Sequence, residues 1–348
     1  MKKNEFFFKS KDNETNIHMV IWEPDGTINA IVQVVHGELE HMGMYEEFAE
    51  YYTRGGILVV GIDLIGHGFS TNNETRKMVL NREGAYEDLV SDIDTCVEYV
   101  KGLHVGVPYV LMGISFGSVL VRNYLIKYPK KIDGSILIGE CDVNNMKLNL
   151  LERQVRKEIK KYGDISASLK YRKIINRWNK KIKNNNTSYD WMNKSNEMIN
   201  KYINDQLRGV DVTNCYFREM ILALRNIQGI DKIKNMDTNK PILIMAGKED
   251  VSTNYGKDAR KLCDKFKKCN IYEVMVKIME DNRHDIMHDD NRYKVYDYIY
   301  GWISQKIYRG IAARRDEVLV DGVENAQEQQ DKYLRAVREK QAKEKYKE

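Results

Sequence analysis

The sequence contains no apolar run that approaches the roughly 20 residues of a membrane-spanning helix. Its first ten residues hold only three consecutive apolar side chains, Phe6 to Phe8, whereas a secretion signal needs a longer apolar core. The five cysteines are an odd number, and no two of them have C-x-x-C spacing. We therefore expect free thiols in a reducing compartment, and a cytoplasmic protein without a signal peptide.

Net charge is also small, but it is unevenly distributed. The whole chain carries +5, while residues 141–240 have ten more basic than acidic side chains. No nucleic-acid-binding motif accompanies these basic residues, so we expect no nucleic-acid partner. Two interpretations of the basic segment stay open, namely a solvated helical surface or a transient contact with an anionic membrane surface.

Short apolar, β-branched runs alternate with amphipathic segments along most of the chain. Such alternation is typical of a mostly parallel sheet that has helices on both faces. The expected strands are 5–10, 16–23, 30–35, 57–62, 108–112, 134–138, 241–245 and 271–276. The expected core helices are 44–54, 84–102, one that ends at residue 128, 254–268 and 291–307. The sequence therefore predicts an α/β fold with an eight-stranded, mostly parallel sheet.

The alternation stops near Cys141 and resumes near Pro241. We predict a core formed by residues 1–140 and 238–307, interrupted by a helical lid at 141–237. The lid follows the sixth or seventh strand, so it should lie above the carboxyl ends of the strands, where open α/β sheets bind ligands. Residues 308–348 are charged and are expected to form a solvated helix or tail, to which we assign no function.

A nucleophile motif follows the strand expected at 108–112. Gly113-Ile-Ser115-Phe-Gly117 matches G-x-S-x-G, in which a serine stands at a sharp turn between a strand and a helix. Glycine on either side removes the Cβ atoms that would clash in so tight a turn. The start of the following helix favours negative charge near the serine. Ser115 is therefore the predicted nucleophile.

A serine hydroxyl needs an adjacent base, and the base needs an acid that orients it. On this fold the acid and then the histidine follow the serine in the chain. Asp250 comes just after the strand at 241–245, and His284 comes after the last strand. Glu249 and Glu140 remain alternatives for the acid, and His288 is an alternative for the base.

His284 and His288 are also spaced like a pair of metal ligands on a helix. No third-ligand motif accompanies them, and the glutamate base of such sites is missing. We therefore predict no metal site, and expect His288 to cap the final helix or to face solvent.

Two backbone N–H groups are needed to hold the oxyanion that forms when a serine attacks a carbonyl. One should belong to Phe116, the residue after the nucleophile. The other should come from the loop His36-Gly37-Glu38-Leu39, after the strand at 30–35. We assign it to Glu38, and expect its amide rather than its side chain to act.

Five motifs in this order resemble the monoglyceride lipase and lysophospholipase branch of the serine α/β-hydrolases, many of which are labelled serine aminopeptidase-like. The resemblance covers about residues 5–307. The sequence departs from the family pattern in two places. At the elbow, Ile114, Phe116 and Ser118 replace the usual His, Met and Gly. In the first motif, Met44 replaces a frequent Arg. The motifs are His36-Gly-Glu-Leu-Glu-His-Met-Gly-Met-Tyr45, Asp63-Leu-Ile-Gly-His-Gly-Phe-Ser70, Gly113-Ile-Ser-Phe-Gly117, Gly247-Lys-Glu-Asp250 and Arg283-His-Asp-Ile-Met287.

The resemblance implies a serine hydrolase without a cofactor that cleaves esters with a single acyl chain, of the monoacylglycerol lipase or lysophospholipase type. Ser115, Asp250 and His284 would form the triad, with Glu38 and Phe116 as oxyanion donors. Substrate contacts are expected from the loop residues His36 and Gly37 and from the lid residues Tyr189 and Trp191. A short-chain carboxylesterase, an acyltransferase or aminopeptidase with the same triad, and a non-catalytic ligand-binding protein remain alternatives.

Overall fold

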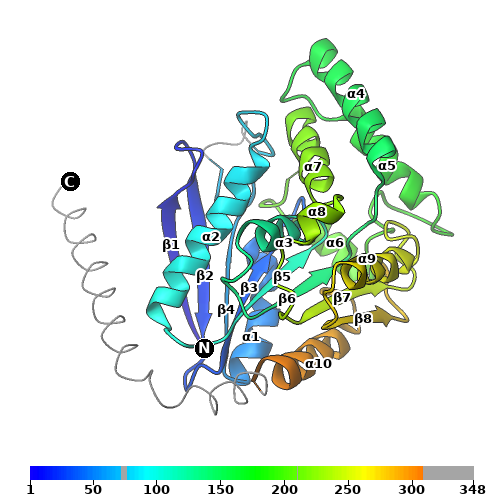
Figure 1. Ribbon diagram of the computed structural model, residues 1–348. Helices are drawn as coiled ribbons and strands as arrows, with labels where there is room; N and C mark the ends of the chain where they lie inside the picture. Colours follow the sequence, from blue (N-terminus) through cyan, green and yellow to red (C-terminus); the bar gives the residue numbers. More distant parts are fainter. Residues whose placement is uncertain (72–76, 210, 309–348) are drawn as a thin grey trace.

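The computed structural model describes residues 1–71, 77–209 and 211–308, which contain one eight-stranded sheet (Figure 1). The strand order is β1-β2-β4-β3-β5-β6-β7-β8. β1 and β2 are antiparallel to their neighbours, and all other pairs are parallel. The predicted α/β class and mostly parallel sheet are therefore confirmed. The strands are Lys2–Lys9, Asn16–Glu23, Ala30–Val35, Ile57–Ile62, Tyr109–Ile114, Gly134–Ile138, Ile242–Gly247 and Val274–Met279.

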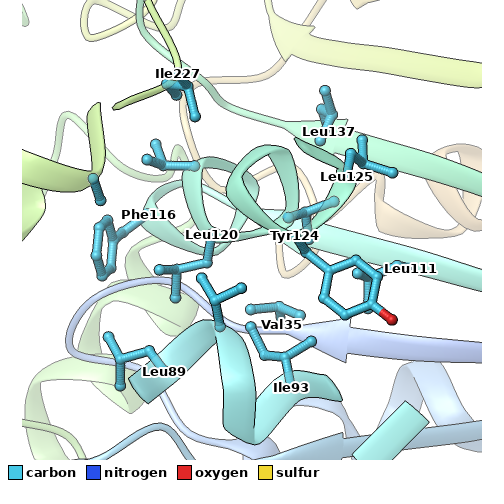
Figure 2. Packing of buried hydrophobic residues seen from close by; sticks show 14 of the residues in the cluster. Val35, Leu89, Ile93, Leu111, Phe116, Leu120, Tyr124, Leu125, Leu137 and Ile227 are labelled. Carbon is cyan, nitrogen blue, oxygen red and sulfur yellow. The ribbon is translucent and has the colours of Figure 1, made fainter. Parts of the chain in front are cut away.

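The central strands are buried on both faces, as expected where helices cover a parallel sheet on each side. Helices α1 (Glu46–Arg54) and α10 (Arg292–Ile303) pack on one face, and α2 (Tyr86–Leu103), α3 (Phe116–Lys127) and α9 (Lys257–Lys268) pack on the other. Figure 2 shows α3 held by Leu120 and Tyr124 against α2 and the strands. This packing fixes the helix that begins directly after Ser115.

Helices α4 to α8 lie between β6 and β7, so the helical insertion follows the sixth strand. Figure 1 shows α4 and α5 farthest from the sheet, with α7 between them and the core. The predicted helical character of this stretch is confirmed, with one isolated bridge between Ala167 and Thr213. The insertion helices are α4 (Asn145–Tyr162), α5 (Leu169–Asn179), α6 (Asn196–Asn204), α7 (Asn214–Asn226) and α8 (Ile230–Ile233).

Polar residues define where the longer insertion helices begin. The side chains of Asn144, Ser168, Ser195 and Thr213 each accept a hydrogen bond from the backbone N–H three residues later. Such caps satisfy amide groups that have no partner inside the helix.

Within the described ranges, no helix is long and apolar enough to cross a membrane.

Two sequence predictions near the carboxyl end of the core were inaccurate. The last strand begins at Val274 rather than at residue 271, because the Ile271 N–H bonds Phe266 O and so closes α9. The last helix is α-helical only to Ile303 and continues as a π-helical turn over Ser304–Tyr308. The tail predicted at 308–348 lies outside the described residues from 309 onward.

Candidate active site

Ser115 occupies a strained turn between β5 and α3. Its φ of 51° and ψ of −118° lie in a region that residues with a side chain rarely adopt. Space around the turn is minimal, since a Cβ on Gly117 would lie 2.0 Å from Val35 O, and one on Gly113 would lie 2.5 Å from Gly117 O. Glycine is therefore required on both sides, and the serine side chain is left at the edge of the sheet.

His284 and Asp250 meet at the same edge of the sheet. His284 Nδ1 lies 2.8 Å from Asp250 Oδ2, and both residues are buried. Burial alone would lower the pKa of His284, but the Asp250 carboxylate and the nearby Glu38 charge raise it to about 9. Burial alone would raise the pKa of Asp250, but the His284 charge and hydrogen bond lower it. The pair thus favours an imidazolium beside a carboxylate.

Two further residues shape this pair, and the sequence analysis did not identify them. Ser252 Oγ donates to Asp250 Oδ1 at 2.6 Å and lies 3.0 Å from His284 Nδ1. Gly139 leaves room for the ring, because a Cβ there would lie 2.9 Å from His284 Cε1. A short polar residue two positions after an aspartate is a known local partner for it, and this was the available signal for Ser252. Nothing in the pattern at Gly139 indicated contact with a distant histidine.

The alternative residues are engaged elsewhere. Glu140 is buried and paired with Arg122, and Glu249 forms a surface ion pair with Lys194. His288 is half-buried in the loop before α10, where Asp285 Oδ1 and Met44 O hold its two ring nitrogens. It therefore neither faces solvent nor caps α10, whose N-cap residue is Asn291. In the parts of the chain that the structure describes, no group of three histidine, cysteine or acidic residues could hold a metal.

The Glu38 side chain points into the site, which the sequence analysis did not anticipate. Ser115 Oγ donates to Glu38 Oε2 at 3.2 Å, and the Tyr171 hydroxyl of α5 donates to Glu38 Oε1 at 2.8 Å. Across residues 1–71, 77–209 and 211–308, the hydrogen bond of the Ser115 side chain goes to Glu38 rather than to His284. The serine is therefore held by a carboxylate in this state.

The backbone amides of Glu38 and Phe116 donate no hydrogen bond within the described part of the chain. Both residues line a cavity that also contains Ser115. Unpaired N–H groups at such a position are suited to hold a developing oxyanion.

His36 and Gly37, the other loop residues that were predicted to contact substrate, lie behind the cavity wall instead of lining it. His36 is fully buried, with Nδ1 2.7 Å from Gly37 O, and its Nε2 accepts from Leu64 N–H at 3.0 Å. Burial lowers the pKa of His36 to about 4, so the ring is neutral at neutral pH. Gly37 N–H donates to Glu40 Oε2 at 2.8 Å. These contacts hold the loop in place and correct the expectation that His36 and Gly37 contact substrate.

Two cavities of different character meet at Ser115. The first, which we call the polar chamber because it is the more polar of the two, has a volume of about 300 Å³. Its lining includes Glu38, Arg172, Tyr189, Trp191, Tyr202 and Asp211, together with aliphatic residues such as Leu39, Ile175 and Val212. The second, the apolar chamber, has about 100 Å³ and is lined by residues that include Phe116, Leu148, Leu151, Phe217, Met220 and Leu224. Both chambers contain Ser115, Glu38, Tyr171 and His284. Tyr189 and Trp191 thus reach the site from the insertion.

The insertion is attached to the loop that carries His284. Arg283 Nη1 donates to Asp190 O at 2.6 Å and to Asn193 O at 2.9 Å. Between these positions, the Trp191 ring lies 4.9 Å from the His284 ring, centroid to centroid. The walls of the polar chamber and the histidine are therefore fixed to one another.

Comparisons with known proteins identify a family and several relatives. Residues 26–291 match the family described as serine aminopeptidase, S33. The human monoglyceride lipase is 32% identical over 124 residues, which are 36% of this chain and 39% of that protein. A monoacylglycerol lipase of Mycolicibacterium smegmatis is 29% identical over 119 residues, covering 34% of this chain and 40% of that protein. These matches span less than half the length of each relative.

Solved structures extend the likeness to the whole fold. A thermostable carboxyl esterase from Bacillus coagulans superposes with a TM-score of 0.81 at 23% identity, covering 88% of this chain and 99% of that one. The family match extends over more than half of the chain, from the loop before β3 to the loop that follows His284. The chain therefore belongs to the serine aminopeptidase (S33) family of α/β-hydrolases.

Proposed function

We propose that this protein hydrolyses carboxylic esters of single-chain lipids, in the manner of a monoacylglycerol lipase or lysophospholipase. The observation that carries the proposal is the meeting of a polar and an apolar chamber at Ser115, beside the His284–Asp250 pair. An ester that joins one acyl chain to a polar alcohol has the same division into an apolar and a polar part. The names of the human and mycobacterial relatives support this substrate class.

In the proposed reaction, Ser115 attacks the ester carbonyl while His284 takes its proton. Asp250 orients His284 and stabilises the imidazolium that forms. The amides of Glu38 and Phe116 hold the oxyanion, and His284 then donates its proton to the leaving alcohol. Water activated by His284 hydrolyses the acyl-enzyme and regenerates Ser115. Before the first step, the Ser115 hydroxyl must leave Glu38 for His284.

The chambers suggest how the substrate lies. The acyl chain would occupy the apolar chamber, and the alcohol would occupy the polar chamber beside Tyr189 and Trp191. The helical insertion, at 141–237 in the predicted division of the chain, would act as the lid over the core at 1–140 and 238–307.

The five cysteines are free, which supports the cytoplasmic setting that we also propose.

The outer face of the insertion supports contact with an anionic membrane. Met146 and Leu150 of α4 are 82% and 55% exposed, respectively. A groove beside Leu150 is lined by Lys147, Lys170, Arg177 and Lys181, none of which has an acidic partner within 4 Å among the described residues. Exposed apolar side chains surrounded by basic ones favour binding to anionic lipid surfaces.

Labelling of the serine tests the proposed function. We expect a fluorophosphonate probe to modify Ser115 in the purified protein, as mapped by mass spectrometry, and Ser115→Ala to abolish both labelling and hydrolysis of monoacylglycerols. Asp250→Asn should lower kcat by about 10³- to 10⁴-fold with the fold intact, because His284 loses its orienting partner. A folded protein whose Ser115 does not react, or that cleaves no ester of the panel, would contradict the proposal.

The activity should depend on pH through His284. Only the neutral imidazole accepts the serine proton, and its pKa is raised to about 9, so kcat/KM should rise about tenfold per pH unit from 7 towards 9 and then level off. Removing the Glu38 charge by Glu38→Gln should move this rise to lower pH. Glu197→Gln, on the exposed face of α6, is the control and should leave it unchanged. A flat profile between pH 6 and 9 would argue against this assignment.

Membrane contact can be measured by flotation with liposomes. We expect the protein to float with vesicles that contain phosphatidylglycerol, and flotation to decrease with added salt. Arg177→Glu combined with Lys181→Glu should weaken it, whereas Lys267→Glu with Lys268→Glu, on exposed positions of α9, should not. Flotation that does not depend on phosphatidylglycerol content would refute the membrane proposal.

A further inference from the structure

The Glu38 carboxylate lies at the junction of the two chambers, where no described residue forms an ion pair with it. Its two oxygens accept hydrogen bonds from Ser115 Oγ and from the Tyr171 hydroxyl. Among the described residues, no lysine, arginine or histidine nitrogen lies within 4 Å of it. A carboxylate that is partly shielded from water and has no counter-charge is costly, unless a ligand supplies the missing partner.

The arginines in and beside the polar chamber are engaged by other groups. Arg172, which lines the chamber, pairs with Asp211. Arg208 stacks on the rings of Tyr189 and Tyr202, with its guanidinium carbon 4.9 Å and 4.7 Å from their centroids. Glu38 helps to raise the pKa of His284, but the His284 charge is already paired with Asp250, so the part of the chamber next to Ser115 keeps one carboxylate without a direct ion pair among the described residues.

This charge affects which alcohols can lie next to the scissile ester. A phosphate close to the ester would place like charges a few ångströms apart beside the protein, where Coulomb repulsion is stronger than in bulk water. A hydroxyl or ammonium group would instead donate to Glu38, and could replace the hydrogen bond that Ser115 now makes there. Binding of such an alcohol would then free the serine hydroxyl for His284.

We propose that the Glu38 side chain, held by Tyr171, is a charge-selective recognition site for the alcohol part of the substrate. It accepts esters whose alcohol carries a hydroxyl or a cationic group near the ester, and it rejects esters with a phosphate at that position. This inference rests on the ester hydrolysis proposed above and specifies its substrate: monoacylglycerol-like esters are cleaved, and lysophospholipid-like esters are disfavoured.

The test compares substrates that share one acyl chain. We would measure kcat/KM for monolauroylglycerol, lauroylcholine and lauroylglycerol phosphate with the wild-type protein, Glu38→Gln and the surface control Glu197→Gln. The wild type and the control should prefer the first two substrates over the phosphate by about 100-fold. Glu38→Gln should reduce that preference at least about tenfold, mainly through faster cleavage of the phosphate-bearing ester. The relative rates with the glycerol and choline esters then show whether Glu38 prefers a hydroxyl donor or a cation, since the trimethylammonium of choline has no N–H to donate.

The possible failures are distinguishable. The role of Glu38 would be overturned if the wild type cleaved the neutral and phosphate-bearing esters at similar rates, or if Glu38→Gln kept the wild-type preference. Either result would leave the proposed ester hydrolysis intact. The proposed hydrolysis would be refuted if none of the three esters were cleaved while Ser115 still reacted with a neutral fluorophosphonate. That result would also refute the inference about Glu38, which rests on the hydrolysis. The same labelling of Glu38→Gln confirms that the variant keeps its elbow intact.

Discussion

The close approach of three backbone segments at the end of β5 determines the geometry of the site. Gly117 lies so near Val35 O that no side chain fits, and this contact joins the elbow to the loop that carries Glu38. The strained conformation of Ser115 persists because β5 and residues 116–125 of α3 are buried. The position of Ser115, the candidate nucleophile, relative to both candidate oxyanion donors therefore follows from core packing.

Electrostatics then divides the site into two regions. Asp250 is buried against His284, so its charge is compensated inside the protein. Glu38 is different, because it bonds only hydroxyl groups and faces both chambers. One carboxylate is thus paired with the candidate base, and the other is the one that we propose selects the alcohol. The insertion contributes to both regions through Tyr171, which holds Glu38, and through Trp191, which lies against the His284 ring.

Most of the fold and the positions of the main polar residues could be predicted from the sequence, because they follow from local patterns. The apolar runs predicted the strands, and G-x-S-x-G predicted a turn at Ser115. The start of β8 was misplaced, since it depends on pairing with β7. Three other features depend on contacts between residues that are distant in sequence, and local patterns could not predict them. They are the direction of the Glu38 side chain, the room that Gly139 leaves for His284, and the buried position of His36.

The central claim is that an acyl chain and its alcohol lie in separate chambers on either side of Ser115. Substituting Leu224→Trp, at a half-buried position of the apolar chamber, tests it most directly, with Leu222→Trp on the same helix as the matched control. The account predicts that Leu224→Trp lowers kcat/KM for p-nitrophenyl laurate at least about tenfold and changes that for the butyrate about twofold or less. The control should change neither. Equal losses for both esters, or no loss for the laurate, would contradict the account.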